Sequence, residues 1–350
     1  MIHQLAAYAV RRACAVLLAV ASMTATALGV VDDRGVRIEL AAPAQRIVTL
    51  APHLTELMFA AGAGDRIVGT VAYSDFPAAA QRIERVGDAN ALDLERLVAL
   101  RPDLVVVWLG GTPQRQLDVL AALGVRLYYQ QPRRLESIAD SLERFGALAG
   151  TSAIARPAAT RYRERLAGIA ARYRARAPVG VFHQIWDRPL MTVGGSHLIS
   201  DVIALCGGRN IFAGLSTLAP VVSAEAMLDA DPELIVAAGT GTPREAGLGE
   251  WLAWPQLRAV ARGNLYVLPP DLISQAAPRI LDGAQLLCEA MEAARRRRPL
   301  LSSPKYRRQM VHRRTNGRGA DRFAFRVAAH QFGFQASLRR EAGCAPRPCA

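Results

Sequence analysis

Short apolar runs alternate with segments of helical periodicity along most of this chain. Four runs in the first half have the length and the β-branched content of strands: Arg46–Leu50, Ile67–Val71, Leu104–Val107 and Val125–Tyr129. Segments of helical periodicity follow these four runs and begin at Thr55, Asp93, Pro113 and Leu135. Strands and helices that alternate at this spacing are typical of a parallel sheet covered on both faces, so the first half predicts an α/β lobe.

The pattern changes in the middle of the chain and then resumes. Residues 152–176 contain no strand pattern, and Leu166, Ile169 and Tyr173 recur at helical spacing. A helix of about 20 residues spans roughly 30 Å, the width of a small domain, so we expect one long helix to join two lobes. The second lobe is predicted from strands at Val181–Ile185, Leu234–Ala238 and Leu265–Leu268 and from helices at Leu198–Cys206, Glu225, Trp251–Val260 and Arg279–Ala294.

This pattern divides the 350 residues into five segments. We expect a signal peptide at 1–27, a first lobe at 28–150, a joining helix at 151–177, a second lobe at 178–296 and a basic, mostly disordered tail at 297–350. Arg11 and Arg12 precede an apolar run, and Ala25-Thr26-Ala27 is a small-x-small cleavage site, as in secretory signals. Retention of this first segment as a membrane anchor is the alternative.

The net charge of +13 belongs to the tail and not to the lobes. From Arg295 onward the chain has 15 basic and 2 acidic residues, whereas residues 28–294 have 26 basic and 28 acidic residues. A basic tail is compatible with contact to nucleic acid or anionic lipid, but we interpret this one as a solvated extension. We therefore expect no nucleic-acid partner.

A helix–turn–strand sequence occurs twice, 130 positions apart. Asp93 and Ser223 are the expected N-cap residues, and a glutamate follows each of them two residues later. One glutamate in a first helical turn contributes about 0.3–1 kcal/mol through the helix dipole. Because Glu95 and Glu225 occupy matching places in two lobes, a surface that docks onto a two-fold symmetric partner explains them better.

Signatures of enzymes are missing from the sequence. It has no phosphate-binding loop, no Gly-x-Ser-x-Gly elbow, no His-Glu-x-x-His and no Cys-x-x-Cys pair. The six histidines do not cluster at metal-ligand spacing, and we interpret His53 as a pocket-wall or capping residue. The sequence therefore predicts no catalytic residue, no metal site and no resident cofactor. Export would permit a disulfide between Cys206 and Cys288, with two unpaired core cysteines as the alternative.

The ends of the predicted strands carry large rings. Ligands of open α/β sheets bind beyond the carboxyl ends of the strands, and aromatic walls there suit a broad, partly apolar ligand between two lobes. Ordinary packing at a sheet edge is the alternative. The residues that we predict to contact a ligand on this basis are Pro52, His53, Tyr73, Trp108, Gly110 and Trp186.

Several stretches resemble one known family. In the first lobe they are residues 46–56 (RIVTLAPHLTE), 73–77 (YSDFP), 93–104 (DLERLVALRPDL) and 108–111 (WLGG). In the second lobe they are residues 205–212 (LCGGRNIF), 222–225 (VSAE), 277–280 (APRI) and 285–288 (QLLC). In order and without large gaps, the likeness runs from about residue 46 to residue 294. Over this range the sequence resembles the helical-backbone metal-chelate receptors and, among them, the periplasmic cobalamin-binding branch of bacterial vitamin ABC importers.

The resemblance implies a class III periplasmic binding protein, with two Rossmann-like α/β lobes of mainly parallel sheet joined by one long rigid helix. It implies a monomeric periplasmic receptor that holds cobalamin or a related corrinoid between the lobes and delivers it to the permease dimer of an ABC importer. Glu95 and Glu225 would dock onto that permease. The resemblance also implies that Tyr73, Trp108 and Asp271 line the pocket and that Cys206 and Cys288 form a disulfide.

Two positions depart from the pattern of the family and leave the identity of the ligand open. Ala89 replaces a second pocket tryptophan, and Gln275 replaces an arginine. The wall of the ligand pocket is therefore altered, and Trp186 is the residue that would compensate for the missing tryptophan. One alternative is a haem or ferric-siderophore receptor of the same fold. Another is an enzyme on the same scaffold, such as a metal chelatase, against which the signal peptide argues.

Overall fold

The computed structural model describes residues 28–88 and 90–298. The predicted signal peptide or anchor at 1–27, the departure at Ala89 and almost all of the predicted tail at 297–350 lie outside these residues. Arg296, the last residue of the final helix, ends the compact unit to which both lobes belong.

A four-stranded parallel sheet forms the centre of the first lobe. Its strands, in the order β4-β3-β5-β6, are β3 (Ile47–Thr49), β4 (Ile67–Thr70), β5 (Leu104–Trp108) and β6 (Leu127–Gln130). Successive residues of a strand point to opposite faces, and β5 follows this rule because Leu104 and Val106 enter one apolar cluster while Val105 and Val107 enter another. Both faces are therefore buried, as the apolar runs predict for a parallel sheet.

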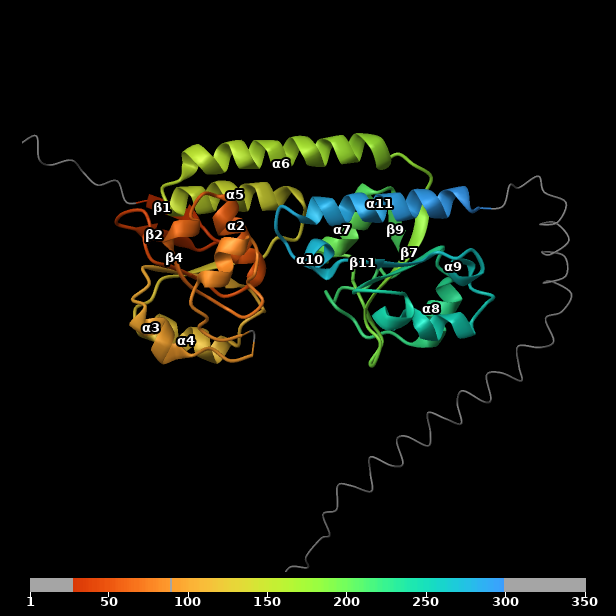
Figure 1. The fold of residues 1–350 in the computed structure, drawn as a ribbon, viewed down its shortest axis with the longest axis horizontal. Helices are drawn as coiled ribbons and strands as arrows, with labels where there is room; N and C mark the ends of the chain where they lie inside the picture. Colours follow the sequence, from red (N-terminus) through yellow and green to blue (C-terminus); the bar gives the residue numbers. More distant parts are fainter. Residues whose placement is uncertain (1–27, 89, 299–350) are drawn as a thin grey trace, which may run out of the picture. The chain divides into compact units, whose positions relative to one another are not determined.

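Helices cover the two faces of this sheet (Figure 1). The cluster on one face includes residues of α2 (Pro52–Ala60) and α5 (Glu136–Leu148). The cluster on the other face includes residues of α3 (Leu94–Ala99) and α4 (Gln114–Ala122). Helix α2 begins at Pro52, three residues before the predicted start, because a proline in the first helical turn has no amide hydrogen that needs a partner. Two short 3-10 helices complete the lobe, η1 (Gly64–Arg66) and η2 (Ala78–Arg82).

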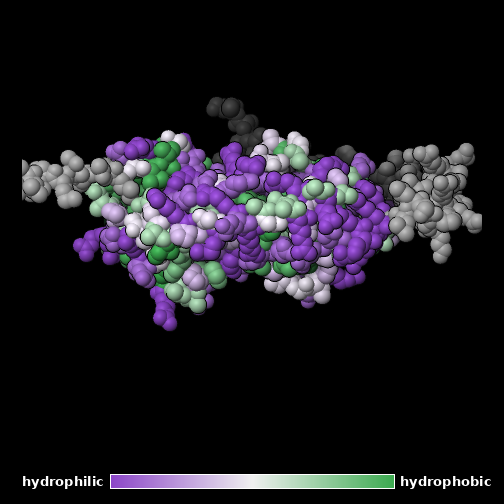
Figure 2. Space-filling model, turned by 90° about the horizontal axis from the view of Figure 1, so that it is seen from above, coloured by the Kyte–Doolittle hydropathy of each residue, from purple (hydrophilic) through white to green (hydrophobic). Residues whose placement is uncertain are grey.

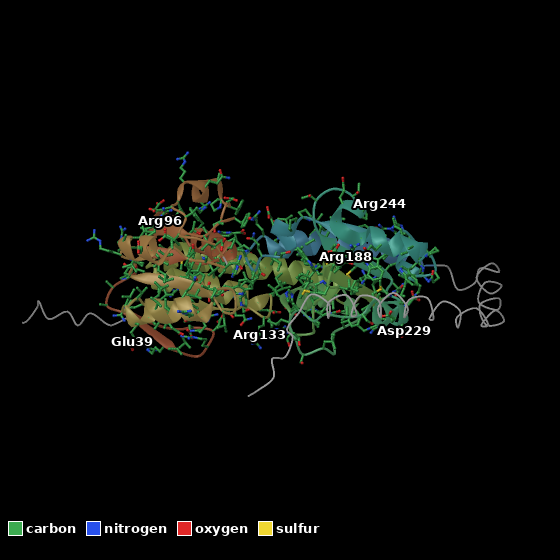
Figure 3. The ribbon with its side chains drawn as sticks, turned by 90° about the horizontal axis from the view of Figure 1, so that it is seen from below. Glu39, Arg96, Arg133, Arg188, Asp229 and Arg244 are labelled. Carbon is green, nitrogen blue, oxygen red and sulfur yellow. A yellow bond between two sulfur atoms is a disulfide. The ribbon has the colours of Figure 1, made fainter. Side chains whose placement is uncertain are left out.

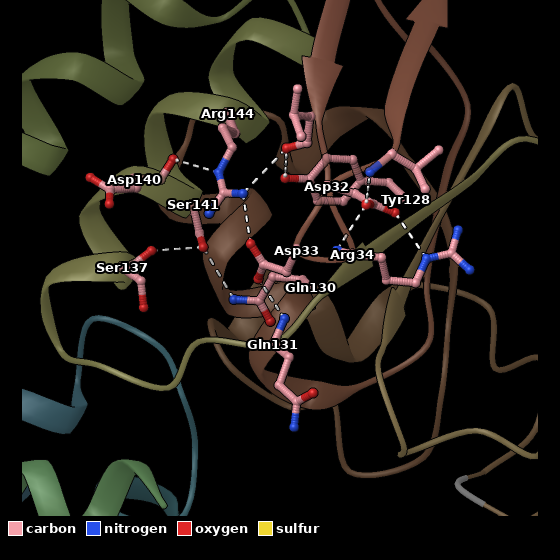
Figure 4. Close-up of polar contacts among 12 residues, drawn as sticks. Asp32, Asp33, Arg34, Tyr128, Gln130, Gln131, Ser137, Asp140, Ser141 and Arg144 are labelled. Carbon is pink, nitrogen blue, oxygen red and sulfur yellow. Dashed lines mark hydrogen bonds and ion pairs between the residues drawn. The ribbon is translucent and has the colours of Figure 1, made fainter. Parts of the chain in front are cut away.

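An antiparallel hairpin that the sequence pattern did not predict precedes the sheet. It consists of β1 (Leu28–Val31) and β2 (Arg37–Leu40). The Asp32 carboxylate closes its turn, because Oδ1 accepts the backbone amides of Arg34 and Val36, both at 2.9 Å. Asp33 joins the hairpin to α5 through an ion pair of 2.7 Å between its Oδ1 and Arg144 Nη1 (Figure 4).

The predicted joining helix is α6 (Ser152–Tyr173), a single helix of 22 residues that contains Pro157. It contacts α5 of the first lobe and α11 (Ile280–Arg296) of the second (Figure 1). Arg163 pairs with Glu143 of α5 at 2.6 Å, and Arg165 pairs with Asp282 of α11 at 2.5 Å. The surface seen from the side of α6 is largely hydrophilic (Figure 2). Helix α6 therefore contacts both lobes with its apolar face and with arginines while its outer face meets water.

A second, mainly parallel sheet forms the centre of the second lobe. Its order is β11-β10-β7-β8, and β9 also pairs with β7. Strand β7 (Val179–Trp186) is long enough to pair with β9 (Gly208–Asn210) through its first half and with β8 (Met191–Thr192) through its second half. Only the β7–β8 pair is antiparallel among the described pairs of this sheet. The remaining strands are β10 (Leu234–Ala238) and β11 (Leu265–Leu268).

The predicted helices of the second lobe are present except near residue 255, and the short helix at Pro270–Ile273 was not predicted. The helices are α7 (Leu198–Leu205), α8 (Ala224–Ala230), α9 (Arg258–Ala261), α10 (Pro270–Ile273) and α11, with two irregular segments, η3 (Arg244–Leu248) and η4 (Gly249–Ala253). The prediction of one helix over Trp251–Val260 is wrong, since the chain forms η4 and then α9. Pro255 lies between them, and a proline removes a helical hydrogen bond and clashes with the preceding turn.

Two carboxylates make direct contacts between the lobes. Glu56 of α2, whose side chain is 4% exposed, accepts the Arg279 Nε–H at 2.9 Å and lies 2.8 Å from Arg279 Nη2. On the other side, Asp201 of α7 accepts the backbone amide of Leu135 at 2.8 Å. Each contact satisfies a carboxylate of one lobe with donors of the other.

A disulfide closes the second lobe. Cys206, directly after α7, is bonded to Cys288 of α11, and both residues are fully buried. The sequence left open whether these cysteines pair, and the disulfide implied by the family resemblance is confirmed.

Candidate ligand-binding site

A cavity of about 270 Å³ lies between the lobes, where the strands of the first sheet end. We call it the floor cavity. Pro52 and His53 come from the start of α2, Trp108 ends β5, and Gln131 follows β6. The other lining residues are Pro132 and Arg133 from the first lobe and Ser196, His197, Leu198, Ile199, Leu218, Ile273, Ser274, Gln275 and Ala276 from the second. Three of the residues predicted from strand ends therefore meet in one cavity.

His53 and Trp108 form one wall of the floor cavity. Their ring centroids are 5.5 Å apart, and their planes are nearly perpendicular at 89°. Trp108 is 42% exposed, whereas His53 is only 6% exposed. The rings thus meet edge to face, with His53 holding the ring of Trp108 from inside while much of Trp108 stays open to solvent.

A chain of hydrogen bonds orients His53. His53 Nε2 lies 3.2 Å from Gln130 Oε1, and Gln130 Nε2 donates to Ser141 Oγ at 3.2 Å. The Ser141 hydroxyl donates in turn to the carbonyl of Ser137 at 2.9 Å (Figure 4). Because the amide nitrogen of Gln130 is committed to Ser141, its oxygen faces His53, and the imidazole must carry its proton on Nε2.

Burial keeps this imidazole neutral. Loss of hydration lowers the pKa of His53 to about 4, against a smaller opposing effect of the hydrogen bond to Gln130. At neutral pH the wall therefore presents an uncharged ring to a ligand. This agrees with the interpretation of His53 as a pocket-wall residue.

The N-terminal hairpin supports the neighbouring wall residue. The backbone amide of Gln131 donates to Asp33 Oδ2 at 2.6 Å, and Asp33 Oδ1 pairs with Arg144 (Figure 4). Sequence reasoning missed this support, because Asp33 and Gln131 are 98 residues apart and neither belongs to a motif. It also missed the segment Ile273–Ala276, although Gln275 stands at a position where the family resemblance has an arginine.

The paired glycines after β5 explain the position of Trp108. Gly110 has a φ of 84°, in the left-handed region that glycine adopts without strain. This turn brings Gly111 against the indole, and a Cβ on Gly111 would clash with the ring of Trp108. Gly110 does not line the floor cavity itself, so its predicted contact with ligand stays a prediction.

Three other predicted contact residues lie outside the floor cavity. Tyr73 follows β4, has a φ of 64° and is 81% exposed. Trp186, which is the last residue of β7 and not the residue after the strand, lines a separate cavity of about 580 Å³ at the carboxyl ends of β7 and β10. Asp271 is exposed in α10, just before the segment Ile273–Ala276. Their roles in binding stay predictions.

The two predicted docking glutamates occupy equivalent places. Glu95 and Glu225 are each the second residue of a helix, and both are exposed. The predicted caps are present, because the Asp93 carboxylate accepts the amide of Arg96 at 2.9 Å and the Ser223 hydroxyl accepts that of Ala226 at 3.1 Å. Neither glutamate lines the floor cavity.

Residues 28–88 and 90–298 contain no metal-binding cluster and no membrane-spanning helix. Nowhere in these ranges do three or more His, Cys, Asp or Glu residues gather in a way that could hold a metal ion. Within the same ranges, every helix is too short or too polar to span a bilayer.

Comparisons with known proteins agree with this architecture. A family model described as "Periplasmic binding protein" matches residues 47–272. The vitamin B12-binding protein of Yersinia pestis (strain Pestoides F) is 39% identical over 248 residues, which cover 71% of this chain and 86% of that protein. The solved structure of the periplasmic vitamin B12 binding protein BtuF of Vibrio cholerae superposes with a TM-score of 0.68 at 35% identity, covering 72% of this chain and 98% of that one.

A solved haem-binding relative is also similar. A periplasmic heme binding protein from Pseudomonas aeruginosa has a TM-score of 0.61 and 28% identity, and the match covers 71% of this chain and 92% of that one. The fold of two mainly parallel α/β lobes and one long joining helix is that of the class III periplasmic binding proteins, as predicted. By its sequence and by its fold, the chain belongs to the periplasmic binding protein family.

Proposed function

We propose that this protein is a periplasmic solute-binding protein and not an enzyme. It captures cobalamin or a related corrinoid between its lobes and delivers it to the permease of an ABC importer. The observation that carries this proposal is the 39% identity to a vitamin B12-binding protein, of which the match covers 86%. The ligand is cargo that the protein carries, not a cofactor.

The floor cavity supports this function by its chemistry. Its wall offers the exposed indole of Trp108 and the neutral ring of His53, which suit a flat macrocycle with apolar edges. The neutral amide of Gln275 also lines this cavity. The two rings come from the end of β5 and the start of α2, and contact between them holds them in place before the ligand arrives, so little conformational entropy is lost on binding.

The surface glutamates support delivery to a permease. Glu95 and Glu225 are exposed, lie at matching helix starts in the two lobes and stay outside the floor cavity. One monomeric receptor that presents one acid per lobe fits a two-fold symmetric permease with a basic residue on each half. Such exposed charges favour orientation and association rate.

Titration calorimetry on the purified protein with cyanocobalamin, cobinamide and haemin tests the proposal. We expect saturable binding of cyanocobalamin at a stoichiometry of about one. Binding of haemin but of neither corrinoid would overturn the corrinoid assignment. Absence of binding to all three compounds would overturn both candidate ligands.

A haem receptor is the second candidate function. The observation that favours it is Tyr73, whose phenol is 81% exposed at the end of the first sheet, because a tyrosine oxygen is an established axial ligand of haem iron. Ligation would change the Soret band of added haemin. Replacing Tyr73→Phe keeps the ring but removes this oxygen, so loss of the spectral change in that variant would identify the ligand.

A further inference from the structure

A second cavity between the lobes adjoins the floor cavity. It has a volume of about 470 Å³, and Arg133 and Ser196 line both cavities, so the two meet at these residues. Arg133 lies near the junction of the lobes (Figure 3). We call this space the basic cavity. Its lining consists of Arg133, Arg134, Gly195, Ser196, Ser200, Asp201, Ala204, Gly208, Arg209, Asn210 and Ala213.

Three arginines and only one acid line the basic cavity. The acid is already occupied, because Asp201 Oδ2 accepts the amide of Leu135 at 2.8 Å and Oδ1 lies 3.8 Å from Arg134 Nη1. Arg134 also pairs with Glu136 at 3.3 Å. Asp201 and Arg134 therefore neutralise each other in a contact between the lobes, and two positive charges remain.

The remaining charges, Arg133 and Arg209, come from different lobes. Arg133 follows β6, and Arg209 is the middle residue of β9. Over residues 28–88 and 90–298, neither guanidinium has a hydrogen bond or an ion pair with another side chain or with the backbone. Two unpaired guanidinium groups in a concave space without a free carboxylate produce a positive potential that attracts an anion.

We propose that the basic cavity is a subsite for an anionic group of the cargo, held by Arg133 of the first lobe and Arg209 of the second. This inference rests on the proposed function and deepens it. A guanidinium binds phosphate and carboxylate oxygens through paired N–H groups. A complete corrinoid offers such an anion in the phosphodiester of its nucleotide loop, and haem offers one in its propionates.

The two cavities suit chemically different parts of the ligand. The lining of the floor cavity contains no Asp or Glu, its histidine wall is neutral, and its one arginine, Arg133, stands where it meets the basic cavity, so the rest of its lining suits the uncharged body of a macrocycle. The basic cavity accepts the charged appendage. Since Arg133 and Arg209 belong to different lobes, an anion that contacts both would connect the lobes directly. The protein would therefore bind the complete ligand more tightly than a fragment that lacks the anion.

Calorimetry with Arg133→Gln and Arg209→Gln tests the subsite. Each change removes one charge-assisted contact, so we expect each to weaken cyanocobalamin binding about tenfold. Cobinamide lacks the phosphodiester, and its affinity should change less than about twofold by the same reasoning. Arg126→Gln is the matched control, because this exposed arginine before β6 carries the same charge and lines neither cavity.

The outcomes separate the subsite from the proposed function. If the unaltered protein binds none of cyanocobalamin, cobinamide and haemin, the proposed function fails. If it binds cyanocobalamin and both variants bind equally well, the subsite is refuted while the function stands. An equal loss for cyanocobalamin and cobinamide would also refute it, because the arginines would then act on the corrin body. The protein could instead bind haemin and not cyanocobalamin. If Arg133→Gln and Arg209→Gln then weaken the binding of haemin, the subsite holds a carboxylate of the haem propionates.

Salt provides a second readout. Added salt screens an interaction between a guanidinium and a phosphate, so it should weaken the binding of cyanocobalamin and not of cobinamide. The salt dependence should shrink in Arg133→Gln and stay unchanged in Arg126→Gln. The same salt dependence in all three proteins would contradict the assignment.

Discussion

The two lobes repeat one helix–turn–strand segment, but the acid after its proline has a different partner in each. In the first lobe the carboxylate of Asp103 accepts the backbone amides of Gln45 and Arg46, at 2.7 and 3.1 Å, and so fixes the start of β3. In the second lobe the matching acid, Glu233, pairs with Arg262 at 3.3 Å. The same sequence signal thus supports the backbone of one lobe and a side-chain ion pair of the other.

The lobes also differ in how they hold the elements near the cleft. The first lobe uses the chain of hydrogen bonds from His53 through Gln130 to Ser141. The second lobe uses a covalent bond between Cys206 and Cys288. A repeated local sequence therefore does not imply repeated tertiary support, because the partners come from segments that are not repeated.

Removal of the disulfide should produce the largest difference in stability between the two lobes. The bond closes a loop of 82 residues, and loss of a native disulfide from a domain costs about 2–5 kcal/mol, mostly through the unfolded chain. We expect the double variant Cys206→Ala/Cys288→Ala to lose that much free energy of unfolding in urea. Hydrogen exchange should show the loss in α7 and α11. Equal loss of protection in α2 and α5 would mean that the lobes do not differ in this way.

Acid titration tests one buried histidine in each lobe. Burial lowers the pKa of His53 to about 4 and that of His183 to about 3, from 6.5 in each case. Below pH 6.5 the unfolded chain binds protons that the folded protein does not, so the free energy of unfolding falls as the pH falls. For His53 the loss is on the order of 3 kcal/mol by pH 4.

Single variants assign this acid sensitivity to a lobe. We expect His53→Gln and His183→Gln each to flatten the fall in urea-unfolding free energy between pH 6.5 and 4, relative to the unaltered protein. If the unfolding free energy of His53→Gln falls with pH as steeply as that of the unaltered protein, a group other than His53 makes the first lobe sensitive to acid.

Ring removal compares how the lobes contact the ligand. We expect Trp108→Ala and Tyr73→Ala each to weaken corrinoid binding by about 1–3 kcal/mol, as the loss of a stacking contact would. Trp186→Ala tests whether the second lobe contributes equally. Calorimetry gives the three affinities, and unchanged values for both Trp108→Ala and Tyr73→Ala would move the pocket away from the end of the first sheet.

The smallest effect on ligand affinity is expected from the docking glutamates. The double variant Glu95→Ala/Glu225→Ala should bind ligand within about threefold of the unaltered protein, because exposed charges contribute little at a distance under physiological salt. Complex formation with the permease should fall sharply, and by more than in either single variant, since two contacts on one rigid body reinforce each other. A double variant that lost ligand but kept the permease would place these residues in the pocket.

Most of the local elements of this protein could be predicted from its amino-acid sequence. The strands of the first sheet, the strands β7, β10 and β11 of the second, the long helix α6 and the caps at Asp93 and Ser223 follow from apolar periodicity and from capping residues, whereas the short strands β8 and β9 were not predicted. These signals act between neighbours in the chain, within one or two turns of helix. They can therefore be read without knowledge of the fold.

The contacts between residues far apart in the chain could not be predicted in this way. The bond between Asp33 and Gln131 joins residues 98 apart, and the pair of Glu56 and Arg279 joins residues 223 apart. The unpredicted hairpin and the arginines of the basic cavity depend on such contacts as well. Long-range contacts form when sheets and helices assemble around buried apolar surface, and no periodic pattern along the chain encodes their partners, so this part of the site became visible only in the folded molecule.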